Sequence, residues 1–65
     1  MDNMERQMLK EKLELCTVGQ KDMFRRMYGH NHKEWSNDQI IDSMPQDRVN
    51  IALAQVERTL QKNGR

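Results

Sequence analysis

Two histidines and one cysteine are the side chains of this 65-residue chain that most directly suggest metal binding or nucleophilic chemistry. His30 and His32 lie two positions apart, so both rings could reach one metal ion. A zinc site, however, needs three or four ligands of set geometry. Folding alone would have to bring Glu34, Asp38 or Cys16 to the pair. We therefore expect two solvated loop histidines and no bound metal.

Cys16 together with a histidine is the one pair in the sequence that could perform nucleophilic catalysis. Cys16 follows Leu9 and Leu13 at helical spacing, which predicts a thiol packed in the core. The three glycines stand far apart, so the sequence contains no glycine-rich phosphate loop. We predict that the protein is not an enzyme, has no catalytic residues and uses no cofactor.

The length of the chain limits the hydrophobic core that it can build. A domain of this size buries only about 60% of the surface that its unfolded chain exposes. Such a core rarely supplies more than about 3–5 kcal/mol without disulfides, metal or oligomerisation. The single cysteine cannot close an internal disulfide. We therefore expect a bound protein partner or self-association, such as a homodimer.

Charge is abundant but balanced, with 32% charged residues and a formal net charge of +1. Neither half of the sequence makes the clustered positive footprint that general nucleic-acid affinity requires. Lone cysteine usage fits a reducing compartment. The first residues lack signal-peptide features, and no apolar stretch approaches the roughly 20 residues of a membrane span. The sequence therefore predicts a cytoplasmic protein with no membrane partner.

Helix-start and helix-stop signals divide the sequence into helices and one loop. Thr17 with Gln20, and Ser36 with Gln39, have the spacing of a capping box. Pro45 ends one helix and fits the first turn of the next, where its missing amide costs nothing. The predicted helices span about residues 3–16, 18–28, 37–44 and 45–62, with a loop at 29–36. The chain 1–65 is thus predicted to be a single all-α domain, a compact bundle of three to four short helices.

Apolar periodicity indicates which residues form the core. The clearest amphipathic stripe lies in the last predicted helix, at spacings of i, i+3, i+4, i+7 and i+11. Its members are Val49, Ala52, Leu53, Val56 and Leu60. Ile51 lies off this stripe and either meets the third helix or is exposed. A second apolar face in helix 18–28 consists of Met23, Phe24, Met27 and Tyr28. Trp35 either anchors the loop to the core, which we favour, or is an exposed binding anchor.

Asp2 or Asn3 can cap the first predicted helix. This helix carries two apolar stripes, although docking against the rest of the domain requires only one. Four of the six methionines lie in the first 23 positions, and methionine suits surfaces that adapt to a partner. We favour one broad face, formed by both stripes and covered by the rest of the domain, over a stripe that faces another molecule. Our leading hypothesis is a protein-interaction module whose contact surface consists of Met1, Met4, Met8 and Leu15.

A local basic patch supports an alternative function, that of a nucleic-acid-binding regulator. Its members are Lys21, Arg25, Arg26 and Lys33. A helix, a turn and a further helix lie nearby, as in helix-turn-helix proteins. Asp22 and Glu34 interrupt the patch, and the last helix offers a mixed surface for reading bases. Protein binding is therefore the preferred interpretation.

Three segments of the sequence carry a family resemblance: Met23-Phe24-Arg25-Arg26-Met27-Tyr28, Ile40-Ile41-Asp42-Ser43-Met44-Pro45 and Ala54-Gln55-Val56-Glu57-Arg58-Thr59-Leu60. Together they resemble small uncharacterised proteins that tailed bacteriophages and prophages encode. The resemblance covers residues 23–61 and includes no catalytic motif. It implies an accessory or regulatory protein of the host cytoplasm that binds a host or phage protein.

Overall fold

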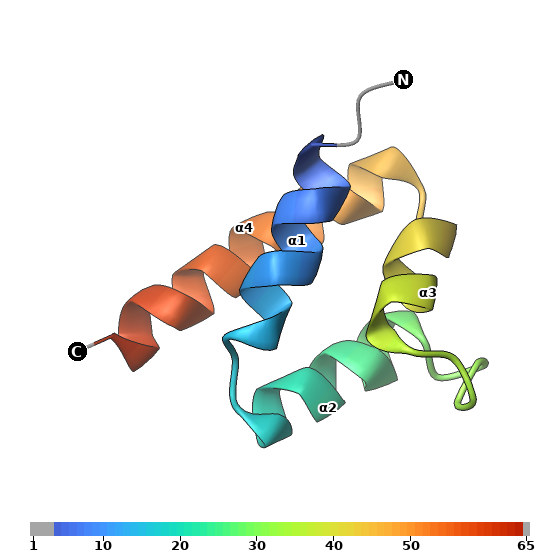
Figure 1. Cartoon of the computed structure of the whole chain (residues 1–65), viewed down its shortest axis with the longest axis horizontal. Coiled ribbons are helices and arrows are strands. Elements are labelled where there is room, and N and C mark those ends of the chain that lie inside the picture. Colours follow the sequence, from blue (N-terminus) through green and yellow to red (C-terminus); the bar gives the residue numbers. More distant parts are fainter. Residues whose placement is uncertain (1–3, 65) are drawn as a thin grey trace.

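Four α-helices make up most of the computed structural model, which describes residues 4–64 (Figure 1). They are α1 (Met4–Glu14), α2 (Val18–Tyr28), α3 (Asn37–Ser43) and α4 (Gln46–Asn63). The prediction of an all-α bundle of short helices is confirmed. Met1 and the predicted cap at Asp2 or Asn3 lie outside the described residues.

Capping boxes fix where α2 and α3 begin. The Thr17 hydroxyl accepts the Gln20 amide at 3.2 Å, and the Gln20 side chain accepts the Thr17 amide at 2.9 Å. Ser36 and Gln39 make the same reciprocal pair at 3.2 and 2.8 Å. Each cap satisfies amides that a helix start would otherwise leave unpaired, and an N-cap side chain typically contributes about 1 kcal/mol.

The predicted helix ends need correction by one or two residues. α1 ends at Glu14, not at Cys16, because the Leu15 and Cys16 amides bond three residues back, to the Lys12 and Leu13 carbonyls. This tight turn leads directly into the cap of α2. The predicted third helix ended at residue 44, but α3 ends at Ser43.

Pro45 explains both the end of α3 and the start of α4. Met44 is extended, with φ −75° and ψ 142°, as steric contact with a following proline requires. Pro45 is itself extended, with ψ 154°, and serves as the N-cap of α4, not as its first-turn residue. α4 therefore begins at Gln46, one residue later than predicted, and it ends at Asn63 instead of residue 62.

α1 lies along α4 and also packs against α3, while α2 packs against α3 (Figure 1). The molecule is flat, with extents of 32 × 27 × 15 Å. Its core residues come from all four helices and the turns between them. They are Leu9, Leu13, Cys16, Phe24, Ile40, Ile41, Met44, Val49, Ala52, Leu53 and Val56. Tyr28 and Trp35 pack at the edge of this core, so Trp35 anchors the loop as we favoured.

Gly29 follows α2 and is buried against α3, so a larger side chain at this position should destabilise the fold. A Cβ at Gly29 would lie 2.9 Å from Cγ1 of Ile40 and closer still to its Cδ1. Because Ile40 is itself fully buried, Gly29→Ala should cost about 1–3 kcal/mol through overpacking. Thermal unfolding followed by circular dichroism should show a clearly lower midpoint.

Gly19→Ala is the matched control for this change. A Cβ at Gly19 meets no atom within 4 Å, and Gly19 lies within α2. Alanine there should raise the unfolding free energy by about 0.4–1 kcal/mol, because it restricts the unfolded chain without strain. Equal midpoints for the two alanine variants would contradict the tight contact between Gly29 and Ile40.

Candidate functional site

The predicted contact surface on α1 does not form a continuous apolar stripe. Met4 and Leu15 are 60% and 72% exposed, at opposite ends of the helix. Met8, between them, packs against the core. The next position on the same side is Glu11, which is exposed and charged. A partner on this side of α1 would therefore meet two separate apolar side chains, because Met8, between them, packs against the core of the protein.

Two of the four predicted basic-patch residues are engaged within the protein. The Arg25 guanidinium donates to the Asn37 side-chain oxygen at 2.9 Å and to the Lys33 and Trp35 carbonyls at 3.0 and 2.7 Å. Lys21 lies 3.6 Å from a Glu14 carboxylate oxygen. Arg26 and the Lys33 side chain are exposed and line a hollow together with Asp22. The patch therefore offers two cations and a carboxylate to solvent.

The histidines and the cysteine do not converge. His32 stacks on Trp35, with ring centroids 3.8 Å apart and planes 8° from parallel. Among residues 4–64, no group of three or more His, Cys, Asp or Glu side chains is placed to hold a metal ion. Cys16 is buried in the turn that follows α1, as its spacing predicted, and its Sγ lies 3.7 Å from the Lys12 carbonyl oxygen.

Burial raises the pKa of the Cys16 thiol above its ordinary value, although nearby Lys21 opposes this shift. Because the thiolate is the nucleophile, iodoacetamide should alkylate the folded protein slowly at neutral pH and rapidly in denaturant. Because the folded protein holds the thiol proton more tightly than the unfolded chain does, this proton contributes to the stability of the folded state. The contribution is complete at pH values below the pKa of the unfolded thiol, and it is lost as the pH rises through the higher pKa of the folded thiol. Urea unfolding across the alkaline range should show that loss in the wild type and less of it in Cys16→Ala. Equal alkylation rates with and without denaturant would contradict the packed thiol.

A mainly apolar groove lies between α2 and α4, with a volume of about 270 Å³. Phe24 and Val56, both core residues, form its floor. Its lining consists of Gln20, Met23, Phe24, Met27, Tyr28, Gln55, Val56 and Thr59. We call this the α2–α4 groove. All of the lining side chains are apolar or uncharged polar, so the groove suits an apolar ligand with a few polar contacts.

Side-chain hydrogen bonds join α2 to α4 on both sides of this floor. The Tyr28 hydroxyl donates to the Gln55 side-chain oxygen at 3.1 Å. The Gln20 and Asn63 side-chain amides exchange two hydrogen bonds, of 3.1 and 2.8 Å. Because Gln20 also caps α2, the start of that helix is held at a fixed place beside α4. The groove is therefore defined by specific contacts and not only by loose packing.

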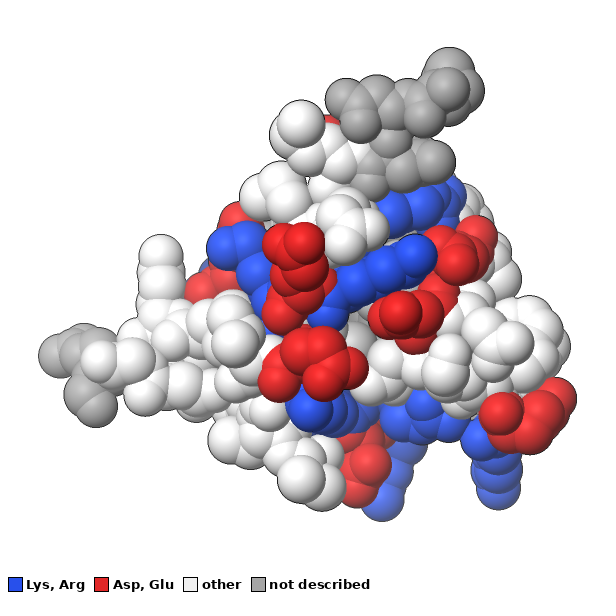
Figure 2. Space-filling model, viewed as in Figure 1, with Lys and Arg blue, Asp and Glu red and all other residues white. Residues whose placement is uncertain are grey.

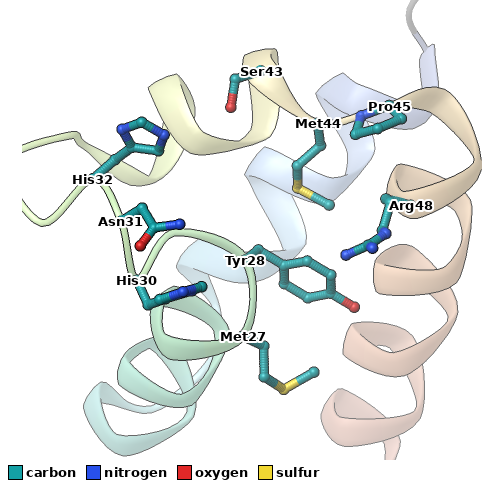
Figure 3. Close-up of a pocket in the computed structure, with 9 residues that line it drawn as sticks. All are labelled: Met27, Tyr28, His30, Asn31, His32, Ser43, Met44, Pro45 and Arg48. Atoms are coloured by element: carbon teal, nitrogen blue, oxygen red, sulfur yellow. The ribbon is translucent and has the colours of Figure 1, made fainter.

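A second hollow, of about 220 Å³, adjoins the groove and shares Met27 and Tyr28 with it. In Figure 3, Met44 and Arg48 extend toward Tyr28 from the turn before α4 and from α4 itself. The rest of the lining is His30, Asn31, His32, Ser43 and Pro45. The two hollows together extend the concave surface along α2 and α4, from Gln20 to Arg48.

Exposed apolar side chains border the groove. Met23 and Met27 are 63% and 47% exposed on α2, and Ile51 is 54% exposed on α4. The sequence placed both methionines on a core face, because they share a helical face with Phe24 and Tyr28. Ile51 lies one turn before Gln55, a groove residue, and its place off the core stripe of α4 is the sequence signal that could have indicated this exposed surface.

Comparisons with protein-family models, with curated proteins and with solved structures found no match. Within residues 4–64, no helix is both long enough and apolar enough to cross a membrane.

Proposed function

We propose that this protein is a small helical interaction module that binds an apolar segment of a partner protein in the α2–α4 groove. The exposure of Met23 and Met27 beside a groove with an apolar floor carries the proposal. A domain of this size depends on burying the apolar surface that it has. Leaving flexible, polarisable side chains exposed at one place is typical of a surface that adapts to a partner.

The dimensions of the molecule fit this mode of binding. The solvent-accessible surface of the protein is 4785 Å². A standard protein interface covers about 800 Å² on each partner. Such a footprint would take about one-sixth of the protein's surface. An amphipathic helix laid into a groove between two helices is a recurring recognition mode, in which anchors at i, i+3, i+4 and i+7 enter the groove.

The nucleic-acid alternative has weaker support, because it needs its four cations free to meet phosphates. Arg25 and Lys21 make their polar contacts inside the fold. The resemblance of residues 23–61 to phage-encoded proteins leads us to propose that the partner is a host or phage protein in the host cytoplasm. An accessory or regulatory role follows from binding alone, without a catalytic step.

Matched methionine variants test the proposal. Met23→Glu places a charge on the groove, and Met4→Glu places the same charge on α1, at positions that are 63% and 60% exposed. The tagged protein would be captured on resin from a lysate of its native cell after nuclease treatment. We expect a stoichiometric protein partner with the wild type and with Met4→Glu, and at least about tenfold less with Met23→Glu, as for the loss of a central interface residue.

Circular dichroism establishes that both variants are folded, which exposed positions should allow. Loss of the partner in Met4→Glu but not in Met23→Glu would move the contact surface to α1. Nuclease-sensitive nucleic acid in place of a protein would favour the regulator that uses Arg26 and Lys33.

A further inference from the structure

The rim of the groove on the α4 side is a single stripe of exposed side chains. Its members are Arg48, Ile51, Gln55, Arg58 and Lys62. They recur at alternating spacings of three and four residues, which places them on one side of the helix. Gln55 lines the groove and Arg48 lines the adjoining hollow, so this stripe is the edge of the concave surface. We call it the α4 rim.

The α4 rim carries three cations and no carboxylate, although the chain as a whole has a net charge of only +1. Of the two carboxylates on α4, Asp47 lies in the first turn, and Glu57 lies 3.7 Å from Lys12 of α1. The ion pairs among residues 4–64 are Lys10 with Asp42, Lys12 with Glu57 and Lys21 with Glu14. The rim cations take part in none of them.

The opposite wall of the groove, α2, lacks this excess of positive charge. On α2, exposed Asp22 and Arg26 balance each other. Figure 2 shows acidic and basic side chains interspersed over the face on which α1 lies. The α4 rim is therefore a local concentration of positive charge at the groove edge, where it acts on whatever occupies the groove.

We infer that the occupant of the α2–α4 groove is an acidic amphipathic helix of another protein. This inference rests on the proposed function and specifies the partner's chemistry. Apolar side chains of the helix cover Met23, Met27 and the groove floor, and carboxylates on its flank face the α4 rim. Arg48 and Lys62 are separated by fourteen residues of helix, about 21 Å, so the matching helix has about four turns.

Two other occupants fit this surface less well. A second copy of the chain, joined by a two-fold axis, would offer the α4 rim another α2 face, whose exposed charges balance, or a second cationic rim. A nucleic acid would supply phosphates to the rim but would leave Met23, Met27 and Ile51 without apolar contact. An acidic amphipathic helix would provide apolar side chains for the groove and carboxylates for the cations of the α4 rim.

Fluorescence anisotropy with designed peptides tests the inference on the full chain. The probe is a labelled synthetic helix of about four turns, with leucine at i, i+3, i+4 and i+7 and glutamate on both flanks. A second peptide has lysine in place of each glutamate. We expect the acidic peptide to bind at least about tenfold more tightly at low salt. This advantage should shrink at 1 M salt, where the screening length falls to about 3 Å.

Matched double variants locate the charge effect. Arg58→Gln/Lys62→Gln removes two rim cations, and Arg26→Gln/Lys33→Gln removes two exposed cations that line a different hollow. The first should abolish most of the acidic preference, and the second should leave most of it, because Arg26 and Lys33 line a different hollow, where Asp22 offsets part of their charge.

The outcomes separate this inference from the proposed function. Equal affinity for the acidic and basic peptides, or an acidic preference that survives Arg58→Gln/Lys62→Gln, would overturn the inference and leave the groove as a protein-binding site. Binding of neither peptide would overturn both. Displacement of the acidic peptide from the groove by a single-stranded oligonucleotide, or a dimer in sedimentation equilibrium that binds no peptide, would assign the groove to one of the other two occupants.

Discussion

The variant Ile40→Ala is expected to be largely unfolded at 25 °C. Ile40 is fully buried in α3, where it contacts Gly29 and belongs to the core formed by all four helices. Truncating a buried isoleucine to alanine costs about 2–5 kcal/mol, because the lost apolar contacts leave a cavity. A domain of this size has a margin of only about 3–5 kcal/mol. Far-ultraviolet circular dichroism should show that the helical signal is already reduced without urea and that unfolding begins at the lowest urea concentrations.

Ile51→Ala is the control for this result, because it makes the same chemical change at a side chain that is 54% exposed. Its unfolding midpoint should stay within about 0.5 kcal/mol of the wild type, as is usual for a surface substitution. Alanine also favours the helix slightly more than isoleucine does. Similar destabilisation in both variants would show that Ile40 is not at the centre of the core.

Arg25→Met should lower the unfolding free energy by about 2–3 kcal/mol. The Arg25 guanidinium ties the last turn of α2 to Asn37 and to the carbonyls of Lys33 and Trp35. A hydrogen bond to a charged group contributes about 1.5–3 kcal/mol, and three bonds from one group are not fully additive. Methionine keeps most of the aliphatic length but leaves these acceptors without their donor. Differential scanning calorimetry should record a fall in Tm of about 10–20 °C.

Two further variants separate geometry from charge at this position. Arg25→Lys keeps the positive charge, but a single ammonium cannot match the planar fork that reaches three acceptors, so it should recover little stability. Arg26→Met removes the neighbouring, exposed cation and should change stability by less than about 0.5 kcal/mol. A larger loss in Arg26→Met than in Arg25→Met would contradict the structural role of Arg25.

Local signals in the sequence were sufficient to predict the helices. Capping pairs such as Thr17 with Gln20 act over three residues, so the sequence contains all the information that they need. The ends of α1 and α3 were less predictable. They depend on how the chain turns at Leu15 and Met44, where three-residue hydrogen bonds and a following proline compete with helix continuation.

The candidate site could be predicted only in part, because periodicity shows which residues share a face but not what covers that face. Met8 and Met23 look alike in sequence, yet the fold packs Met8 against the core and leaves Met23 exposed beside the groove. Arg25 also looked like a surface cation. Its acceptors in the loop come within reach only after α2, the loop and α3 have packed together.

Methyl NMR of the methionines tests the binding site most directly, because methionines lie on α1, in the groove and in the adjoining hollow. The protein would be labelled with ¹³C at its methionine methyl groups and titrated with the acidic amphipathic peptide. We predict shifts or broadening at Met23 and Met27 in the groove and at Met44 in the adjoining hollow, with Met4 unchanged. Movement of the Met4 and Met8 resonances, with Met23 and Met27 unmoved, would place the contact on α1 and contradict the groove as the functional site.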